Sequence, residues 1–367
     1  MFSFVIRFIG AVVVLASLQL SQAAPPTSQP HTPEVVFLNP GFSNEPFWVT
    51  YSQFMHAAAK NLGLNLSVIY GERDRENIIQ SARAIAENDT KPDYVIFVNE
   101  MYVGPEILRI FSDSSVKLFS LHSTLTPEQQ EISGGSRERY ENWIGSLIAN
   151  DEDAGYLMAK ELISKTNGAP AEMLAFAGVR STPSSTLRER GLLRALSEHP
   201  EIKLHQVVFG EWSEQRAYDQ AKLLLKRYNT PRLVWSANDE MAFGVMKAAR
   251  EIGKVPGQDL YLSGLNNSDR VLQARINSEI SALASGHFSL GGWALVMLHD
   301  YHAGEDFAKR GGKDRVDNLF ALLDAEQAQQ LMLHLKIPGY KLNFKDFSAV
   351  YHPELKNYQF SIKNLTH

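Results

Sequence analysis

Short apolar runs and helical patterns alternate along the chain from residue 34 onward. Each run is three to seven residues long, which is typical of a buried β-strand. The segment after the second run places these apolar residues on one helical face: Ile78, Ile79, Ala82, Ile85 and Ala86. A second helix is predicted over residues 213–228, because Ala217, Ala221, Leu224 and Leu225 share one face, and Pro231 ends it. Strands that alternate with helices in this way predict βαβ units and mainly parallel sheets.

The runs fall into two groups, which are separated by a stretch of polar and glycine residues at 124–142. The first group lies at residues 35–38, 64–70, 94–98 and 116–121. The second group begins at 144–149 and continues at 173–177, 207–209, 233–236, 260–263 and 280–284. The chain is therefore predicted to contain two similar α/β halves, followed by a less regular end with one helix near 324–335.

The first residues have the layout of a secretory signal. Arg7 precedes an apolar run at residues 8–18, and small residues stand at Ser21 and Ala23, the two positions that a signal peptidase reads. A membrane anchor would need about 20 continuous apolar residues, and this run is shorter. We therefore predict a cleaved signal at residues 1–23 and a flexible lead at 24–33, which makes the mature protein exported and soluble.

Composition narrows the classes of function. The chain of 367 residues contains no cysteine, which excludes thiolate catalysis, thiolate zinc sites, disulfides and a lipid on an N-terminal cysteine. The net charge of −5 is spread along the chain, so no basic surface for a nucleic acid or an anionic membrane is expected. Phosphate-binding loops, nucleophile elbows and the zinc helix motif are also absent from the sequence.

One group of residues has the spacing of metal ligands. His299 and His302, with Asp300 between them, could share a helical face. Catalytic zinc usually takes three protein ligands, and no third is predictable nearby, so a solvated helix end is the preferred interpretation. No metal or cofactor is predicted.

An ordered series of motifs follows the predicted strands. The motifs are Asn44-Glu45-Pro46-Phe47-Trp48, Arg188-Glu189-Arg190-Gly191-Leu192, Asn238-Asp239-Glu240-Met241-Ala242-Phe243-Gly244, Gly264-Leu265-Asn266 and Ser285-Gly286-His287-Phe288-Ser289-Leu290-Gly291. In this order and spacing, residues 34 to about 310 resemble the ribose-type periplasmic sugar-binding proteins. These belong to the type I receptor family, which also contains the autoinducer-2 receptor. The Gly-His-Phe version of the last motif is similar to the receptor-like branch near that protein.

The resemblance implies an α/β fold of two Rossmann-like lobes with mainly parallel sheets joined by a multi-strand hinge. The lobes would comprise residues 34–147 plus about 287–318, and residues 148–286 plus about 319–367. It also implies a periplasmic solute-binding protein without enzymatic activity. Such a receptor closes around a sugar, a sugar-like signal or a polyol, and acts as a monomer. It presents the closed form to an inner-membrane ABC permease or to a sensor kinase or cyclase.

The resemblance and the strand ends together predict these ligand-binding residues: Asn44, Phe47, Trp48, Asn99, His122, Asn150, Arg188, Trp212, Asn238, Asn266 and Ser285. Trp48 and Trp212 would stack on a sugar ring, although core packing is an equal alternative for Trp212 and for Phe47. Arg188 would offer its planar set of N–H donors to a vicinal diol or to a carboxylate. Asp239 is expected to cap the helix that begins there.

Some positions depart from the ribose-type pattern. His122 and Asn266 stand where that pattern has aspartates, and Ser285 stands where it often has a glutamine. Plain ribose is therefore a poor candidate ligand. Glu100 and Asp151 could restore the missing acceptors, although both could equally be solvated.

Two other classes of protein share features of this sequence. A sugar-responsive repressor needs an N-terminal DNA-binding domain, and the first strand here begins already near Val35. An exported hydrolase would need a pair of carboxylates such as Glu100 and Asp151 to meet across a cleft. Spacing along the chain leaves this second alternative open.

Overall fold

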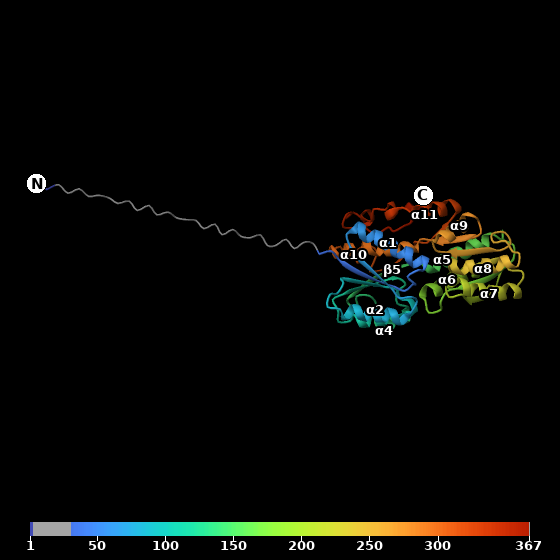
Figure 1. Cartoon of the computed structure of the whole chain (residues 1–367), viewed down its shortest axis with the longest axis horizontal. Helices are drawn as coiled ribbons and strands as arrows, with labels where there is room; N and C mark the ends of the chain where they lie inside the picture. Colours follow the sequence, from blue (N-terminus) through green and yellow to red (C-terminus); the bar gives the residue numbers. More distant parts are fainter. Residues whose placement is uncertain (3–30, 367) are drawn as a thin grey trace. The chain divides into compact units, whose positions relative to one another are not determined.

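Residues 31–366, which the computed structural model describes together with Met1 and Phe2, contain two six-stranded sheets (Figure 1). The first sheet has the order β11 (Asp314–Asp317), β5 (Trp143–Ala149), β4 (Lys117–His122), β3 (Tyr94–Phe97), β1 (Glu34–Asn39) and β2 (Asn65–Tyr70). The second has the order β12 (Ala321–Leu323), β10 (Ala282–Ser285), β9 (Tyr261–Leu265), β8 (Leu233–Ser236), β6 (Ala171–Ala177) and β7 (Ile202–Phe209). The predicted signal sequence and most of the lead lie outside the described residues.

The pairing of the strands is parallel except between β10 and β12. Within residues 31–366 the chain passes from one sheet to the other at three places, after β5, after β10 and between β11 and β12. This arrangement confirms the predicted α/β fold of two Rossmann-like halves with a hinge of several segments. The lobe boundaries given above remain a prediction.

Helices cover both sheets. The first half of the chain contains α1 (Pro46–Leu62), α2 (Arg75–Glu87), η1 (Glu100–Tyr102), α3 (Gly104–Ile110) and α4 (Pro127–Ser133). The second sheet is accompanied by α5 (Asp151–Ser164), α6 (Pro183–Ser197), α7 (Glu214–Arg227), α8 (Asp239–Glu251) and α9 (Asp269–Ile276). After β10 follow η2 (His287–Ser289), α10 (Leu290–His302) and η3 (Phe307–Lys309). None of the helices in the described part of the chain is both long enough and apolar enough to cross a membrane.

The structure corrects one prediction about these elements and adds three elements that the apolar pattern did not predict. Strand β5 was expected to open the second half, but it pairs with β4 and β11 in the first sheet. The polar stretch at 124–142 contains α4, whose capping box joins Thr126 and Gln129. Strands β11 and β12 were missed, because β11 has only one apolar residue and β12 only three residues.

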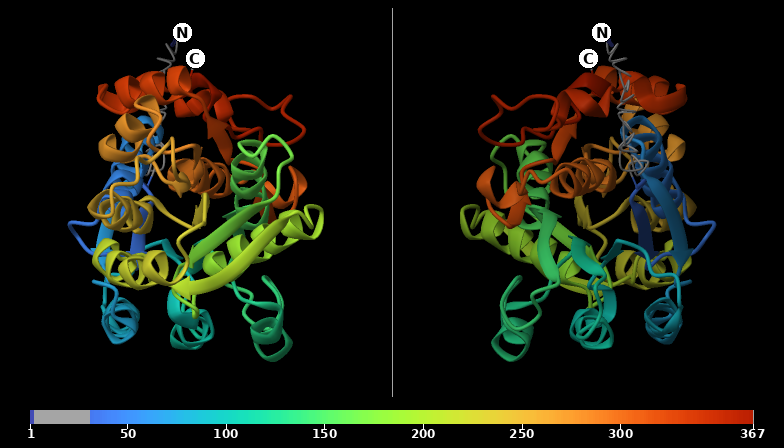
Figure 2. Two further views of the ribbon diagram at one scale, coloured as in Figure 1. Left: turned by 90° about the vertical axis from the view of Figure 1, so that its right-hand side faces the viewer. Right: turned by 90° about the vertical axis from the view of Figure 1, so that its left-hand side faces the viewer.

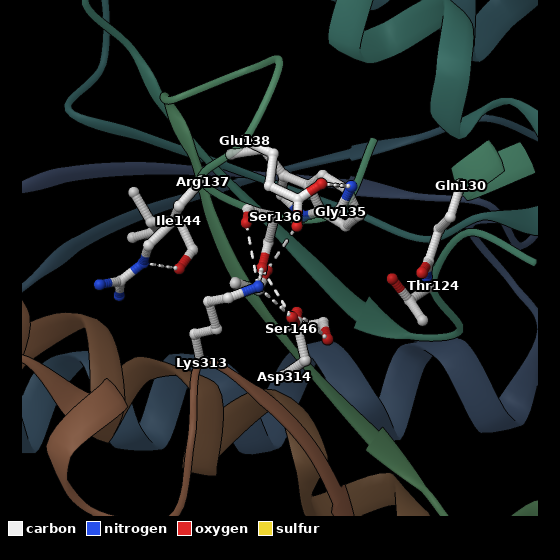
Figure 3. A network of polar contacts seen from close by, with 12 residues as sticks. Thr124, Gln130, Gly135, Ser136, Arg137, Glu138, Ile144, Ser146, Lys313 and Asp314 are labelled. Atoms are coloured by element: carbon white, nitrogen blue, oxygen red, sulfur yellow. Dashed lines mark hydrogen bonds and ion pairs between the residues drawn. The ribbon is translucent and has the colours of Figure 1, made fainter. Parts of the chain in front are cut away.

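A polar network holds β11 at the edge of its sheet (Figure 3). The Lys313 ammonium donates to the backbone oxygen of Ser136 at 3.0 Å and contacts Asp314 at 2.9 Å. Asp314 also accepts from the hydroxyl groups of Ser136, at 2.7 Å, and Ser146, at 2.9 Å. Side-chain contacts of this kind stabilise a strand that apolar burial alone would not specify.

The C-terminal segment contacts both halves. It contains α11 (Ala325–His334), η4 (Pro338–Lys341), η5 (Phe344–Phe347) and α12 (Lys363–Thr366). Helix α11 packs against α9, whereas η4 packs against α1 and η5 packs against both α1 and α10. Figure 2 shows this segment in red, on the opposite side from α2 and α4. The helix predicted near 324–335 is therefore confirmed, and the residues after it return to the first half.

Candidate functional site

A cavity of about 390 Å³ lies between the two halves, where strands of both sheets end. The first half lines it with Glu45, Phe47, Trp48, Arg73, Glu100 and His122. The second half lines it with Thr182, Ser184, Arg188, Trp212, Asn238 and Asn266, and His287 belongs to η2, which follows β10 and packs against α1 of the first half. Each of these residues ends a strand or follows the carboxyl end of one. This is the place where open α/β sheets bind ligands.

Aromatic rings form one wall of the cavity. Phe47 stacks on His287 with ring centroids 4.5 Å apart, and Trp48 meets His122 edge to face at 5.1 Å. Trp212 lines the cavity from the other half, with the Arg188 guanidinium 5.6 Å from the centroid of its ring. The aromatic residues predicted to stack on a ligand thus share one cavity.

Several buried nitrogen atoms of this wall have no hydrogen-bond partner within residues 31–366. They are Nε1 of Trp48, Nδ1 of His122 and Nδ1 of His287. Buried polar atoms are nearly always hydrogen-bonded, and leaving one unpaired costs about 1–3 kcal/mol. These atoms are therefore available to a ligand that brings its own donors and acceptors.

Both imidazoles are held in the neutral form. Burial, with smaller contributions from Arg188 and Arg73, lowers the pKa of His122 to about 3. Burial, with contributions from Arg188 and His122, also lowers the pKa of His287 well below its usual value. A neutral imidazole offers one donor and one acceptor, which suits hydroxyl groups.

The Arg188 guanidinium is anchored within the second half. Its Nε donates to Asp151 at 2.7 Å, and its Nη1 donates to the backbone oxygen of Ala237 at 3.0 Å. Both partners of this ion pair are almost fully buried. Burial raises the pKa of Asp151, although Arg188 acts in the opposite direction. Asp151 is therefore a buried support for Arg188, and the alternative of a solvated carboxylate is wrong.

A second charged group joins the two halves. The Arg73 guanidinium contacts Glu45 through Nε and Glu100 through Nη1, each at 3.0 Å. The Thr182 hydroxyl, from the second half, donates to Glu100 at 2.9 Å. Burial raises the pKa of Glu100 despite Arg73 and Thr182. Glu100 is thus buried and paired, which corrects the alternative that it is solvated.

Asn238 and Asn266 belong to one network at the start of α8. Asn238 caps the helix, because its Oδ1 accepts from the backbone N–H of Met241 at 3.0 Å. Asp239 was expected to be the cap, but it accepts from Nδ2 of Asn266 at 2.6 Å and from Ser268 at 2.9 Å. Burial raises the pKa of Asp239 to about 6, even though these hydrogen bonds lower it. The carboxylate orients Asn266 toward its position in the cavity wall.

Four of the 13 non-glycine residues that have a positive φ angle in the described part of the chain line the cavity. Positive φ angles occur at Arg73 (55°), His122 (67°), Trp212 (63°) and Asn266 (138°). Residues other than glycine rarely adopt such angles, and they persist where the surrounding structure holds them in place. The surrounding structure therefore fixes the backbone at these four positions of the cavity wall.

Four predicted residues lie away from the cavity wall. Asn44 is exposed at an outer opening, and Asn99 is buried with hydrogen bonds to Thr124, Gln129 and Gly104. Asn150 caps α5, and its Nδ2 donates to Asp153 and Asn318. Ser285 is fully buried, and its hydroxyl has no partner among the described residues.

Sequence reasoning missed five residues of the wall: Glu45, Arg73, Thr182, Ser184 and His287. Glu45 and His287 stand inside the motifs quoted above, so the motifs themselves were a signal. Arg73 follows a predicted strand, and the rule that strand ends meet at one edge could have found it. Thr182 and Ser184 carried no such signal, because small polar residues at a helix start usually serve as caps.

The residues near the end of α10 that have the spacing of metal ligands are engaged in other contacts. Asp300 is fully buried and accepts from the backbone N–H of Ala349 at 2.6 Å and from Tyr358 at 2.8 Å. The preferred interpretation, a solvated helix end, is therefore wrong for this residue. In the described part of the chain, no cluster of three or more His, Asp or Glu side chains could hold a metal ion.

Comparisons with known proteins agree with this geometry. A family model described as periplasmic binding protein domain matches residues 141–306. The crystal structure of a periplasmic sugar-binding protein from Pseudomonas fluorescens is 50% identical in sequence and has a TM-score of 0.84. That match covers 91% of this chain and 99% of the other chain.

More distant relatives have named ligands. The chain is 21% identical over 247 residues to the galactofuranose-binding protein YtfQ of Escherichia coli, which covers 66% of this chain and 74% of that protein. It is 22% identical over 261 residues to the D-allose-binding periplasmic protein of Escherichia coli, which covers 70% and 81%. The placement near the autoinducer-2 receptor remains a prediction. The chain belongs to the type I periplasmic binding proteins, in the family of ribose-type sugar-binding proteins.

Proposed function

We propose that this chain is a periplasmic receptor that closes its two halves around one small, uncharged, hydroxyl-rich ligand, a sugar or a sugar-like molecule. The cavity carries the proposal, because its charged groups are paired within the protein while buried nitrogen atoms of its aromatic wall are not.

The paired charges favour a neutral ligand. Arg188 is bound to Asp151, and Arg73 is bound to Glu45 and Glu100. A charged ligand would have to be desolvated in this cavity without a free counter-charge, which is costly. Hydroxyl groups can pair with neutral imidazole and indole nitrogens without that cost.

The receptor is proposed to be exported and to act as a monomer. Its closed form would be presented to an inner-membrane ABC permease, which imports the ligand, or to a sensor kinase or cyclase. The Glu100–Thr182 hydrogen bond supports the closing motion, because it joins residues from the two halves beside the cavity.

The alternative is an exported hydrolase that acts on carbohydrates. Its candidate carboxylates, Glu100 and Asp151, are each bound to an arginine, and the relatives named above are binding proteins. Recovery of the bound ligand in chemically unmodified form, with no released reducing sugar, is the expected result. Release of reducing sugar would support the hydrolase.

The ligand class is tested by thermal unfolding and small-angle scattering. The panel consists of galactofuranose, ribose, allose, arabinose, polyols, furanosyl borate and nucleosides. A ligand at 100 times its Kd stabilises the folded state by about 2.7 kcal/mol, so the right member raises Tm and compacts the protein. A panel that changes neither measurement contradicts the proposed ligand class.

Arg188 provides the local test. In Arg188→Ala the ligand-induced rise in Tm, measured against the variant without ligand, is expected to disappear. Arg194→Ala is the matched control, because Arg194 lies on the same helix with 39% of its side chain exposed and does not line the cavity. Trp212→Ala is the second variant if Arg188→Ala does not fold. An undiminished rise in Arg188→Ala would remove this residue from the site.

A further inference from the structure

A large groove adjoins the cavity. It has a volume of about 1080 Å³ and lies between the two halves of the chain. The first half contributes Tyr102, the loop at 122–128 and Ile148, and the second half contributes Asp151 and the first two turns of α6. His122 and Ser184 line both the groove and the cavity, so the two spaces meet at these residues.

Helix α6 is the wall between the two spaces. Ser184 and Arg188, which are four residues apart, line the cavity. Pro183 and Leu187, also four residues apart, line the groove. Residues with this spacing share a helical face, so adjacent faces of one helix serve the two spaces. One ligand can therefore contact both faces without any change in the helix.

The groove is mainly apolar, unlike the cavity. Its apolar side chains are Tyr102, Leu125, Pro127, Ile148, Pro183 and Leu187. Ile148 and Leu187 are only partly buried, although they come from different halves. An apolar group between them would remove further apolar surface from water on both sides, which is favourable.

A second opening of the cavity also has apolar lining residues, among them Phe42, Met101 and Val179, but more carboxylates border it than border the groove. Glu211, Glu214 and Glu240 line it, together with Glu45 and Glu100 of the cavity wall. An apolar group placed there would take carboxylates away from water, which is unfavourable. The groove is the better path for an apolar part of a ligand.

We propose that the groove binds the apolar aglycone of a glycoside, an aryl or alkyl group, while the sugar of the same molecule occupies the cavity. This inference rests on the proposed function, because it requires a sugar in the cavity. It narrows the ligand class from free sugars to glycosides. The glycosidic bond stays intact, and its oxygen lies where cavity and groove meet, beside His122 and Ser184.

Titration calorimetry on the full mature chain tests the inference. The probes are the methyl and phenyl glycosides, in both anomeric forms, of each sugar in the panel above. For one sugar and anomer, the phenyl glycoside is expected to bind roughly tenfold more tightly than the methyl glycoside. This factor corresponds to burial of roughly 60 Å² of additional apolar surface.

Leu187→Gln tests the role of the groove. Its matched control is Leu193→Gln on the same helix, where Leu193 is 48% exposed. The phenyl-to-methyl ratio of affinities should fall to about one in Leu187→Gln and stay unchanged in Leu193→Gln. Ile148→Thr gives the same test from the first half if Leu187→Gln does not fold. A ratio near one in the parent protein, with free sugars bound, overturns this inference alone. Failure of every sugar and glycoside to bind overturns the proposed function.

Discussion

The cavity can be compared with a cluster that the C-terminal segment forms with α10. Both regions are buried and aromatic and contain carboxylates, but their polar atoms differ in whether they have hydrogen-bond partners. The C-terminal cluster comprises Trp293, Phe344, Phe347, Tyr358 and Phe360 around Asp300. There the indole nitrogen of Trp293 donates to Ser289 at 2.9 Å. In the cavity the equally buried indole nitrogen of Trp48 has no partner within residues 31–366.

The carboxylates show the same contrast. Burial alone would raise the pKa of Asp300, but donors from His299, Ser348, Tyr358 and the backbone of Ala349 outweigh it and lower that pKa. At the cavity, burial prevails and raises the pKa values of Glu100, Asp151 and Asp239. In the cluster the polar atoms find their partners within the chain, whereas the cavity has polar atoms that a ligand can pair with.

Truncation of a side chain in the C-terminal cluster should give the largest change in the free energy of unfolding. Trp293→Ala removes a fully buried ring that stacks on Phe360 at 5.2 Å, so the free energy of unfolding should fall by about 3–5 kcal/mol. Urea unfolding measures this loss. The affinity of the folded fraction for a sugar should stay unchanged, because no cluster residue lines the cavity. A loss below about 1 kcal/mol in the free energy of unfolding would show that the cluster is not a well-packed core.

The pH dependence of stability should separate the two kinds of carboxylate. In the folded chain Asp239 has a pKa of about 6, and its ordinary value is 3.8. Between these values the folded state binds more protons than the unfolded state, so its contribution to the free energy of unfolding falls as pH rises from about 4 to about 6. Asp239→Asn should remove this fall, which is of the order of 1–3 kcal/mol.

Asp300→Asn is the control for this profile. Because the folded pKa of Asp300 is lowered, its contribution is present above the ordinary value of 3.8 and is lost as pH falls through the folded pKa. The two variants should therefore change the profile in opposite directions when urea unfolding is measured between about pH 3 and pH 7. If the free energy of unfolding had the same slope against pH in Asp239→Asn and in the parent, the contrast between the two kinds of carboxylate would be contradicted.

Replacement of Trp293 or Trp48 by phenylalanine should give the smallest change in the free energy of unfolding. Trp293→Phe leaves Ser289 without its indole donor, whereas Trp48→Phe removes a nitrogen that is already unpaired in the absence of ligand. The first change should cost about 1 kcal/mol more in the free energy of unfolding than the second. Sugar affinity, measured by calorimetry, should fall a few-fold in Trp48→Phe only. Equal costs and equal affinities would contradict a binding role for this nitrogen.

Local patterns predicted the elements well where burial was continuous. The ten apolar runs correspond to β1 to β10, and the helices predicted at 213–228 and 324–335 are α7 and α11. The same patterns failed for β11, because Asp314 and the preceding Lys313 depend on partners at Ser136 and Ser146. Such partners are far away in the chain and leave no local periodicity.

The candidate site was predicted in part for a similar reason. Trp48, Arg188, Asn238 and Asn266 follow strands, and the carboxyl ends of parallel strands meet at one edge. Asn99 also ends a strand, but its amide is occupied by Thr124 and Gln129. The position of a residue in the chain does not reveal which neighbours will use its hydrogen bonds.

The sequence by itself determined the alternation of strands and helices, the family and the side of the sheets where the cavity lies, because these follow from burial and from the order of motifs. The tertiary structure decided the remainder. It placed β5 in the first sheet, paired Arg73 with Glu100 and Arg188 with Asp151, and left the nitrogen of Trp48 without a partner. Charge pairing and desolvation depend on groups that are distant in the chain and meet only after folding.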